Sequence, residues 1–554
     1  MVRKGYCAAT ITRKPTQPSS RQSPTGPFGG KTSGEGRPSG CWRAVLETEL
    51  KFEIDQACAA GLIERLSLNA EGRRRQLITV YYDTPKGDLA KAGFVLRVRD
   101  DGRRRVQAVK QASQDGGSLR RGEWEHPIEG AAFDLKAARR TPLRRSLKPA
   151  IAAALGPVFV VDVERAKCDL PAGGGVVEMA LDRGEVRAGG HATPIHELEL
   201  ELKSGSASIL FDLARELMVE FPLNLAFISK AERGRMLLAG DAGGAVAARI
   251  PALKADDSAA HAFRVIANGA LEQAASNAAL MRAGHGAEAL HQTRVGLRRL
   301  RSALTLFRPM LADKRFDVVA GELKWLAKSL DDARDLDVFL AEALRTAPAG
   351  GADEPGFDAF VISLRAAHAK AYERALAAID SARCRLLFLD SLAWIDAGAW
   401  CESPALEAVH WRARPIKALA NELLQARWRK LLKKGRKLDG LSVDQRHKLR
   451  IAGKKLRYAA GFFASLYTAK THKRFGKAAS DLQDALGALT DIAAGRTLVE
   501  RVTLPGDDPL ASGATPPPAF AVGRLTGHRE ADEAQALKTA LKAFKRFEGV
   551  DRFW

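Results

Sequence analysis

The sequence predicts an α+β multidomain protein in which a closed β barrel with a charged interior precedes an all-α domain. Several segments between residues 46 and 203 alternate apolar and charged residues with a period of two, the pattern of β-strands. Residues 256–554 are rich in Ala and Leu and show helical periodicity. One helical segment recurs at an offset of 156 residues, which indicates an internal duplication. A chain of 554 residues is long enough for two or three domains.

Composition excludes several classes of protein. Hydrophobic residues make up 46% of the chain and charged residues 27%, values that exclude a fibrous or wholly disordered protein. No apolar run approaches the roughly 20 residues of a membrane-spanning helix, so we expect no membrane partner. The six Cys are scattered without a C-x-x-C pair, which argues against a disulfide scaffold or a zinc ribbon and favours a cytoplasmic location.

The net charge of +22 indicates a polyanionic partner, but the excess is unevenly distributed. Residues 47–240 hold 30 Lys or Arg against 28 acids, whereas residues 410–480 hold 20 against three. Residues 1–43 are basic and rich in Ser, Pro and Gly, so we expect a disordered N-terminal extension. Two interpretations stay open for this extension: a dispensable tail or over-extended start, and an organellar transit peptide.

The barrel prediction depends on how charges are sorted among the strands. Some alternating segments place acids on one face, such as 46–54 and 197–203, whereas 96–99 places Arg there. Solvated faces would explain any one of these strands but give no reason to separate carboxylates from guanidinium groups. A closed barrel with a polar lumen would use both. Clustered carboxylates bind hard cations, and Lys and Arg bind phosphoryl oxygens, so such a lumen favours phosphoryl transfer.

The motif Glu47-x-Glu49-x-Lys51 resembles the E-x-E-x-K signature of the CYTH family, the triphosphate tunnel metalloenzymes. The resemblance covers residues 44–240 and implies an eight-stranded antiparallel tunnel, followed by a linker at 241–255. Members of the family include inorganic triphosphatases, thiamine triphosphatases and a class of adenylate cyclase. Further segments that match in order are 81–85, 96–99, 109–110, 121–125, 181–186, 197–201 and 229–234.

The resemblance also implies roles for individual residues. The metal, Mg²⁺ or Mn²⁺, would be held by Glu47, Glu49, Glu199 and Glu201, with Asp182 and Glu178 as further candidates. The phosphates would be held by Lys51, Arg97, Arg99, Lys110 and Arg165. Lys51, Glu47 and Glu49 would be catalytic, with Lys51 orienting or deprotonating the attacking water. Lys167 stands where the family often has a second arginine, and Asp83 is expected to have a structural role in a turn.

The duplicated helical segment carries a histidine and cations at matching positions. Residues 291–307 match residues 447–463, and at about 100° per residue the cations fall on one stripe of each helix. Two pseudo-symmetric helical bundles are therefore predicted, with their basic stripes facing one another across a groove for a flexible polyanion. A solvated basic face is the simpler alternative, but it does not explain why the stripes match.

This pattern resembles the CHAD family, the conserved-histidine α-helical domain, over residues 256–504. Members of that family bind inorganic polyphosphate. The contacts implied here are His291, Arg294, Arg298, Arg301, His447, Arg450, Lys454 and Arg457. A segment at 330–337 and Lys454-Lys455-Leu456-Arg457-Tyr458 also match family motifs. The remaining residues, 505–554, should form a Pro-rich linker and a short C-terminal helix over 530–547.

Together these patterns predict a cytoplasmic enzyme that hydrolyses inorganic triphosphate to diphosphate and phosphate, with the helical domain binding polyphosphate. An association with polyphosphate granules is a further expectation. One alternative is a non-enzymatic polyphosphate-binding protein, and another is an adenylate cyclase. Nucleic acid is disfavoured as the partner because the basic helices lack interleaved aromatic residues for base stacking.

Overall fold

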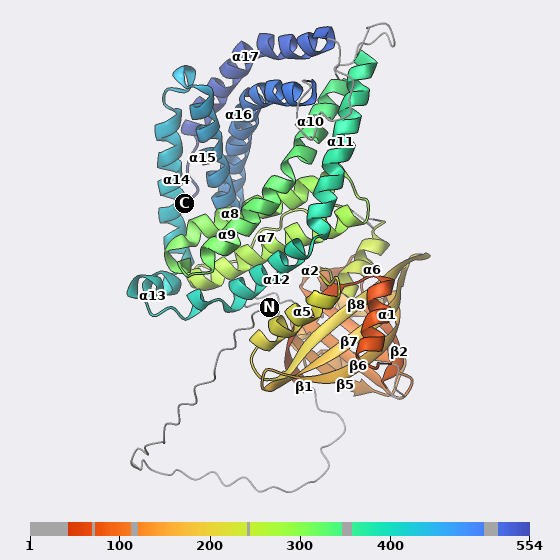
Figure 1. The fold of residues 1–554 in the computed structure, drawn as a ribbon. Coiled ribbons are helices and arrows are strands. Elements are labelled where there is room, and N and C mark those ends of the chain that lie inside the picture. Colours follow the sequence, from red (N-terminus) through yellow and green to blue (C-terminus); the bar gives the residue numbers. More distant parts are fainter. Residues whose placement is uncertain (1–42, 69–72, 112–119, 241–243, 346–356, 504–518) are drawn as a thin grey trace, which may run out of the picture. The chain divides into compact units, whose positions relative to one another are not determined.

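The computed structural model describes residues 43–68, 73–111, 120–240, 244–345, 357–503 and 519–554. Strands dominate the N-terminal part and helices the C-terminal part, as predicted (Figure 1). The expected N-terminal extension, apart from its last residue, and most of the Pro-rich linker lie outside these residues. No helix in the described ranges has the length and apolar character needed to cross a membrane.

The N-terminal sheet closes into the predicted eight-stranded antiparallel barrel. Its strands follow the order β5-β4-β3-β2-β6-β7-β8-β1, and pairing of β1 with β5 closes the ring. A short ninth strand pairs with β1. The strands are β1 (Arg43–Glu53), β2 (Arg74–Asp83), β3 (Phe94–Asp100), β4 (Arg105–Gln111), β5 (Arg120–Ile128), β6 (Gly156–Ala172), β7 (Gly175–Ala188), β8 (His191–Ser204) and β9 (Asn224–Leu225).

The barrel has much of its apolar core outside the sheet. On β1, Leu50 and Phe52 point outward and are buried, while Glu49 and Lys51, which alternate with them, point into the lumen. Helices α1 (Gln56–Arg65) and α5 (Ser208–Glu220) supply apolar residues to this outer core. The charged residues of each alternating pattern therefore line the interior, which confirms the barrel with a polar lumen.

Helix α6 (Lys230–Leu238) packs against one end of the lumen (Figure 1). Its Ala231 and Leu237 belong to a buried cluster with inward-pointing residues of β2, β6, β7 and β8. A capping box starts the helix, because the Ser229 side chain accepts from the Glu232 N–H and Glu232 accepts from the Ser229 N–H. Gly234 lies against Phe159, where an added Cβ would be 2.4 Å from the ring.

Short helices complete the barrel domain. After β2, the Asp83 carboxylate accepts hydrogen bonds from the backbone N–H groups of Thr84, Leu89 and Ala90 at 2.7 to 3.0 Å, which confirms its structural role in the turn. The short helices are α2 (Asp88–Lys91), α3 (Leu135–Ala138), η1 (Pro142–Arg145) and α4 (Pro149–Ala153).

The C-terminal part is helical, and the two duplicated segments form α8 and α15, which contact one another. Neighbouring helices pack within two groups, α7 to α12 and α14 to α17 (Figure 1). The last helix is longer than predicted and begins at Ala519 rather than near residue 530. The helices are α7 (Ala259–Arg282), α8 (Ala287–Leu311), α9 (Phe316–Ser329), α10 (Asp331–Arg345), α11 (Phe357–Asp380), α12 (Ala382–Ala397), η2 (Ala399–Cys401), α13 (Leu406–Ala413), α14 (Ile416–Gly435), η3 (Leu438–Gly440), α15 (Val443–Phe462), η4 (Ala464–Leu466), α16 (Ala469–Thr503) and α17 (Ala519–Glu548).

Candidate functional site

The barrel encloses a cavity of about 930 Å³ with a mostly charged lining. Acids reach it from β1, β5, β7 and β8, and bases reach it from β1, β2, β3, β4, β6, β8 and α6. Cations and carboxylates therefore share one enclosed space, as the alternating strands predict.

Three buried carboxylates form the centre of the site. Asp182 on β7 and Glu197 and Glu199 on β8 each place an oxygen within 4.8 Å of the others. They meet because Asp182 lies opposite Glu197 across the β7–β8 ladder, and Glu199 follows two residues later on the same face. Like charges this close would repel strongly in a buried site, so the cluster requires cations.

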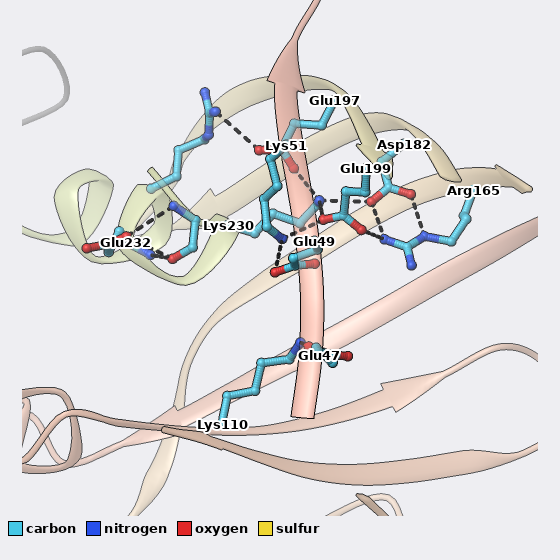
Figure 2. A network of polar contacts seen from close by, with 12 residues as sticks. Glu47, Glu49, Lys51, Lys110, Arg165, Asp182, Glu197, Glu199, Lys230 and Glu232 are labelled. Carbon is cyan, nitrogen blue, oxygen red and sulfur yellow. Dashed lines mark hydrogen bonds and ion pairs between the residues drawn. The ribbon is translucent and has the colours of Figure 1, made fainter. Parts of the chain in front are cut away.

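Lys51, Arg165 and Lys230 neutralise this cluster (Figure 2). The Lys51 ammonium lies 2.8 Å from Glu199 and 3.2 Å from Glu49, so it joins β1 to β8. Arg165 donates to both oxygens of Asp182 and to Glu199, each at 2.6 Å. Lys230 lies 2.9 Å from Asp182 and 3.0 Å from Glu199, and also pairs with Glu197.

These contacts fix the protonation states of the cluster. Burial would raise the pKa of Asp182, but Arg165 and Lys230 outweigh it and lower that pKa to about 2. Burial would lower the pKa of Lys51, but Glu199 and Glu49 outweigh it and raise the pKa above its ordinary value. Lys51 is therefore a proton donor near neutral pH, which supports a role in orienting water and opposes one in deprotonating it.

A second group surrounds Glu47, lower in the view of Figure 2. The Lys110 ammonium lies 2.7 Å from Glu47 and 3.0 Å from Glu123, and Arg97 donates to Glu123 at 3.0 Å. Burial and a hydrogen bond with Glu123 raise the pKa of Glu47 to about 8, against the opposing effect of Lys110. Glu47 and Glu123 therefore share a proton, with Glu123 as the ionised partner.

Arg99 differs from the inner lumen cations Lys51, Arg97, Lys110, Arg165 and Lys230 because it makes no ion pair with any described residue. Its Nε is buried without a hydrogen-bond partner. Burial lowers the pKa of Arg99 to about 10, and the neighbouring Arg97 and Arg165 act in the same direction. The guanidinium remains protonated at neutral pH, so the lumen holds a cation that lacks an anion.

The donor set fits a hard divalent cation. Asp182, Glu197, Glu199 and Glu49 offer only carboxylate oxygens, which Mg²⁺ and Mn²⁺ prefer, and no described Cys or His lines the cavity. A cation held by these residues would share them with the amines of Lys51 and Lys230.

The other predicted metal ligands lie elsewhere in the lumen. Glu178 accepts from Lys167 at 2.7 Å, and Glu201 lies 2.9 Å from Lys203. Along β6, β7 and β8, these residues follow the central cluster in the direction away from α6. We call this end the mouth and define it by the charged residues Arg73, Arg75, Asp101, Arg104, Lys167, Glu178, Glu201 and Lys203.

Three residues of the central groups were not predicted as site residues. Glu197 has the same parity on β8 as Glu199, and Glu123 lies in the matched segment 121–125, so both could have been found from the alternation. Lys230 lies in the matched segment 229–234, but no periodicity indicates that a helix residue reaches the lumen. Its participation depends on where α6 packs.

In the helical domain, cations of the two repeats lie near one another. Burial lowers the pKa of Arg298, and Arg294, Arg334 and Arg450 lower it further. Because Arg450 lies on α15 and Arg298 on α8, the two basic stripes approach each other there. Burial and Arg334 also lower the pKa of His291, so His291 is neutral at pH 7.

The other predicted polyphosphate contacts differ in their surroundings. Arg294 pairs with Asp331 and donates to the Ala327 carbonyl at 3.2 Å, which ties α8 to the helices that follow it. Arg301 lies close enough to Lys455 to lower the pKa of that lysine, after the larger effects of burial, Arg427 and Lys430. The side chains of His447 and Arg457 are exposed, and that of Lys454 is half-buried.

Comparisons with known proteins agree with both halves of the chain. Residues 46–234 match the CYTH domain family, and residues 246–500 match the CHAD domain family. An inorganic triphosphatase of Haemophilus influenzae is 30% identical over 196 residues, 35% of this chain and 55% of that protein. The chain thus spans about half the length of the curated relative it matches.

Solved structures also match parts of this chain. The CHAD domain from the plant Ricinus communis is 28% identical and covers 54% of this chain and 96% of its own, with a TM-score of 0.46. PptA from Streptomyces chartreusis is 18% identical and covers 52% of this chain and 100% of its own, with a TM-score of 0.38. From the two family matches and their order, the chain carries a CYTH domain followed by a CHAD domain.

Proposed function

We propose that the barrel hydrolyses inorganic triphosphate to diphosphate and phosphate. The observation that carries this proposal is Arg99, a protonated lumen guanidinium without an ion pair among the described residues, beside buried carboxylates suited to a metal ion. The name of the Haemophilus influenzae relative supports the same activity. A phosphate chain would supply the anion that Arg99 lacks.

Different lumen residues would have different roles in phosphoryl transfer. Arg97, Arg99 and Arg165 would bind phosphoryl oxygens and stabilise the charge that develops on the leaving phosphate. Asp182, Glu197, Glu199 and Glu49 would hold Mg²⁺ or Mn²⁺, which supplies Lewis-acid stabilisation of phosphoryl oxygens when bound. Lys51 and Lys110 would orient the phosphate chain of the substrate, since both are positioned by carboxylates and donate hydrogen bonds. The protein would act in the cytoplasm.

A phosphate-release assay tests this activity. The full chain is incubated with tripolyphosphate and either Mg²⁺ or Mn²⁺, and we expect one phosphate per substrate. Glu49→Gln should lower kcat/KM by about 10² or more, because it removes one predicted metal ligand. The matched control is Glu185→Gln on the outer face of β7, which should keep wild-type activity. Absence of turnover with either metal, in a folded preparation, would contradict the proposal.

A parallel incubation with ATP, in which cyclic AMP is measured, tests adenylate cyclase activity, the alternative reaction in a tunnel of this kind. Incubation with ATP should give no cyclic AMP if the lumen serves inorganic triphosphate. Formation of cyclic AMP at a rate above that of phosphate release from tripolyphosphate would favour the cyclase.

For the helical domain we propose polyphosphate binding, with recruitment to polyphosphate granules as one consequence. The approach of Arg298 and Arg450, from the two repeats, supports this role. Arg298→Ala with Arg450→Ala should weaken binding of long-chain polyphosphate about tenfold, measured by fluorescence anisotropy. Arg308→Ala with Lys324→Ala removes the same charge from exposed positions of α8 and α9 and serves as the control. Equal weakening by both pairs, or tighter binding of DNA than of polyphosphate, would contradict the role.

A further inference from the structure

The mouth of the tunnel carries a second group of cations that the predicted triphosphate site does not use. Arg75, Arg104, Lys167 and Lys203 line the same cavity as the central cations. Their side chains are 39% to 74% exposed, whereas those of Lys51, Arg97 and Arg165 are 10% to 16% exposed. The lumen therefore has an inner zone of buried cations and an outer zone of partly hydrated ones.

Strand geometry makes the two zones continuous. Arg75 lies directly opposite Arg165 across the β2–β6 ladder, and Lys167 is the next inward residue after Arg165. Inward residues on one strand repeat at about 7 Å, so Lys167 lies one such step beyond the inner zone. On β8, Lys203 follows Glu199 by two steps in the same direction. A linear anion leaving the inner zone would meet these cations in turn.

The mouth cations form ion pairs with carboxylates, but another anion can displace these carboxylates. Asp101 lies 3.1 Å from Arg75 and 3.7 Å from Arg104. Glu178 lies 2.7 Å from Lys167 and 3.5 Å from Lys203. Because the cations of these pairs remain 39% to 74% exposed, the pairs are weak, and phosphoryl oxygens can compete for the cations.

The size of the cavity also exceeds what a triphosphate needs. Triphosphate has 13 non-hydrogen atoms, and at about 30 Å³ for each water-sized atom it would fill at most ~400 Å³. The cavity of about 930 Å³ extends from the mouth to α6, and more than half of this volume remains for further phosphate units or water.

We infer that the mouth is a binding subsite for the distal phosphates of linear inorganic polyphosphates longer than triphosphate. The inference rests on the proposed function and extends its substrate class. The terminal phosphates occupy the inner zone, and the rest of the chain lies along Arg75, Arg104, Lys167 and Lys203. Water attacks the terminal phosphorus, and the bond from that phosphorus to the bridging oxygen breaks. Orthophosphate and a chain one unit shorter leave, and the proton released from water passes to solvent.

A chain-length series tests the subsite. Values of kcat/KM are measured for linear tri-, tetra- and pentapolyphosphate with the wild type and with Arg75→Ala combined with Arg104→Ala. We expect turnover of all three chains, and a loss of about tenfold with pentapolyphosphate but a much smaller loss with tripolyphosphate. Lys167→Ala with Lys203→Ala, on other strands of the mouth, should give the same dependence on length.

The control pair is Arg183→Ala with Arg187→Ala, which removes two arginines from the outer face of β7. It should leave all three values unchanged. If the mouth variants lose the same factor with every chain length, the subsite is overturned while triphosphate hydrolysis stands. The same follows if the wild type turns over only tripolyphosphate. If the folded wild type hydrolyses no chain at all, both proposals fall.

Discussion

At the scale of single residues, Lys230 shows how closely the central carboxylates depend on buried cations. It contacts Asp182, Glu197 and Glu199, and its own side chain is only 10% exposed. Removing one partner of a buried ion pair is far more destabilising than removing an exposed one, because the remaining charge stays buried without compensation. When no metal ion is bound, the three carboxylates therefore depend on Lys230 together with Lys51 and Arg165.

We predict that Lys230→Met lowers the free energy of unfolding of the barrel by about 3 kcal/mol in chelator. The corresponding fall in Tm is about 6 °C or more for a domain of this size. Added Mg²⁺ should recover part of the loss, because a divalent cation can replace the missing ammonium. Thermal denaturation with and without metal measures both effects.

Arg183→Met is the control for this change, since Arg183 pairs with Glu164 at partly exposed positions outside the barrel. It should cost less than about 1 kcal/mol. A Lys230→Met protein as stable as the wild type in chelator would show that the carboxylates do not depend on this ammonium.

The raised pKa of Glu47 leads to a prediction about pH. The family resemblance implies Glu47 as a further metal ligand, beside the central carboxylates. Because its pKa is about 8, the carboxyl is protonated at pH 7, and it must lose its proton to bind a metal ion. Metal affinity should therefore rise with pH up to about 8, and binding at pH 7 should release a proton. Calorimetry in two buffers of different ionisation enthalpy detects that release, which Glu47→Gln should abolish and Glu185→Gln should preserve. A binding enthalpy independent of buffer at pH 7 would contradict a ligand role for Glu47.

At the scale of elements, helix α6 determines which side chains reach the lumen from outside the sheet. It delivers Lys230 to the carboxylates, and its position depends on the close approach of Gly234 to Phe159. A helix residue can contribute to a barrel interior only when the helix backbone comes this near to the strands.

We predict that Gly234→Ala displaces α6, because the new Cβ would lie 2.4 Å from the Phe159 ring. The shift should withdraw Lys230 and lower kcat/KM for tripolyphosphate about tenfold. Adding Phe159→Leu should restore part of the activity by making room for the methyl group. Gly321→Ala, a helical position with open space around it, is the control. Wild-type activity of Gly234→Ala would show that α6 tolerates the change.

The elements also show what a sequence reveals and what it does not. Alternation along 46–54 and 197–203 predicted both the strands and the inward face that carries Glu49 and Glu199. It could not distinguish depth, since Glu199 and Glu201 share a face, yet one lies in the central cluster and the other at the mouth. Depth depends on the stagger between strands, and Lys230 depends on tertiary packing. Neither leaves a period in the sequence.

At the scale of the whole molecule, residues 1–46 carry +7 of the net charge of +22, and the remaining +15 is divided between two different arrangements. In the barrel, bases and acids are nearly equal in number and pair inside an enclosed space. In the helical domain, the cations of α8 and α15 accumulate with fewer acids nearby. Besides burial, Arg450 on α15 lowers the pKa of Arg298 on α8, and Arg301 on α8 lowers that of Lys455 on α15. Long-range attraction of a polyanion is therefore a property of the helical domain, and chemistry is a property of the barrel.

These arrangements should respond differently to salt. We predict that raising the NaCl concentration from about 50 to about 200 mM weakens polyphosphate binding at least tenfold, because several partly exposed cations contribute. The kcat for saturating tripolyphosphate should change much less, because the lumen ion pairs are buried and poorly screened. Anisotropy and phosphate release at four salt concentrations measure the two responses. A parallel decline of both would indicate one shared site.

The barrel that keeps much of its apolar core outside the sheet has a consequence for how such a domain can change over evolutionary time. Because Leu50, Phe52 and their neighbours support the fold from the outer side, the lumen side chains can be exchanged without dismantling that core. Replacing buried ion pairs with apolar residues of similar volume is often neutral or stabilising. Loss of catalysis would then leave a well-folded barrel, so descendants that retain the architecture as a mere spacer or ligand sensor are readily accessible.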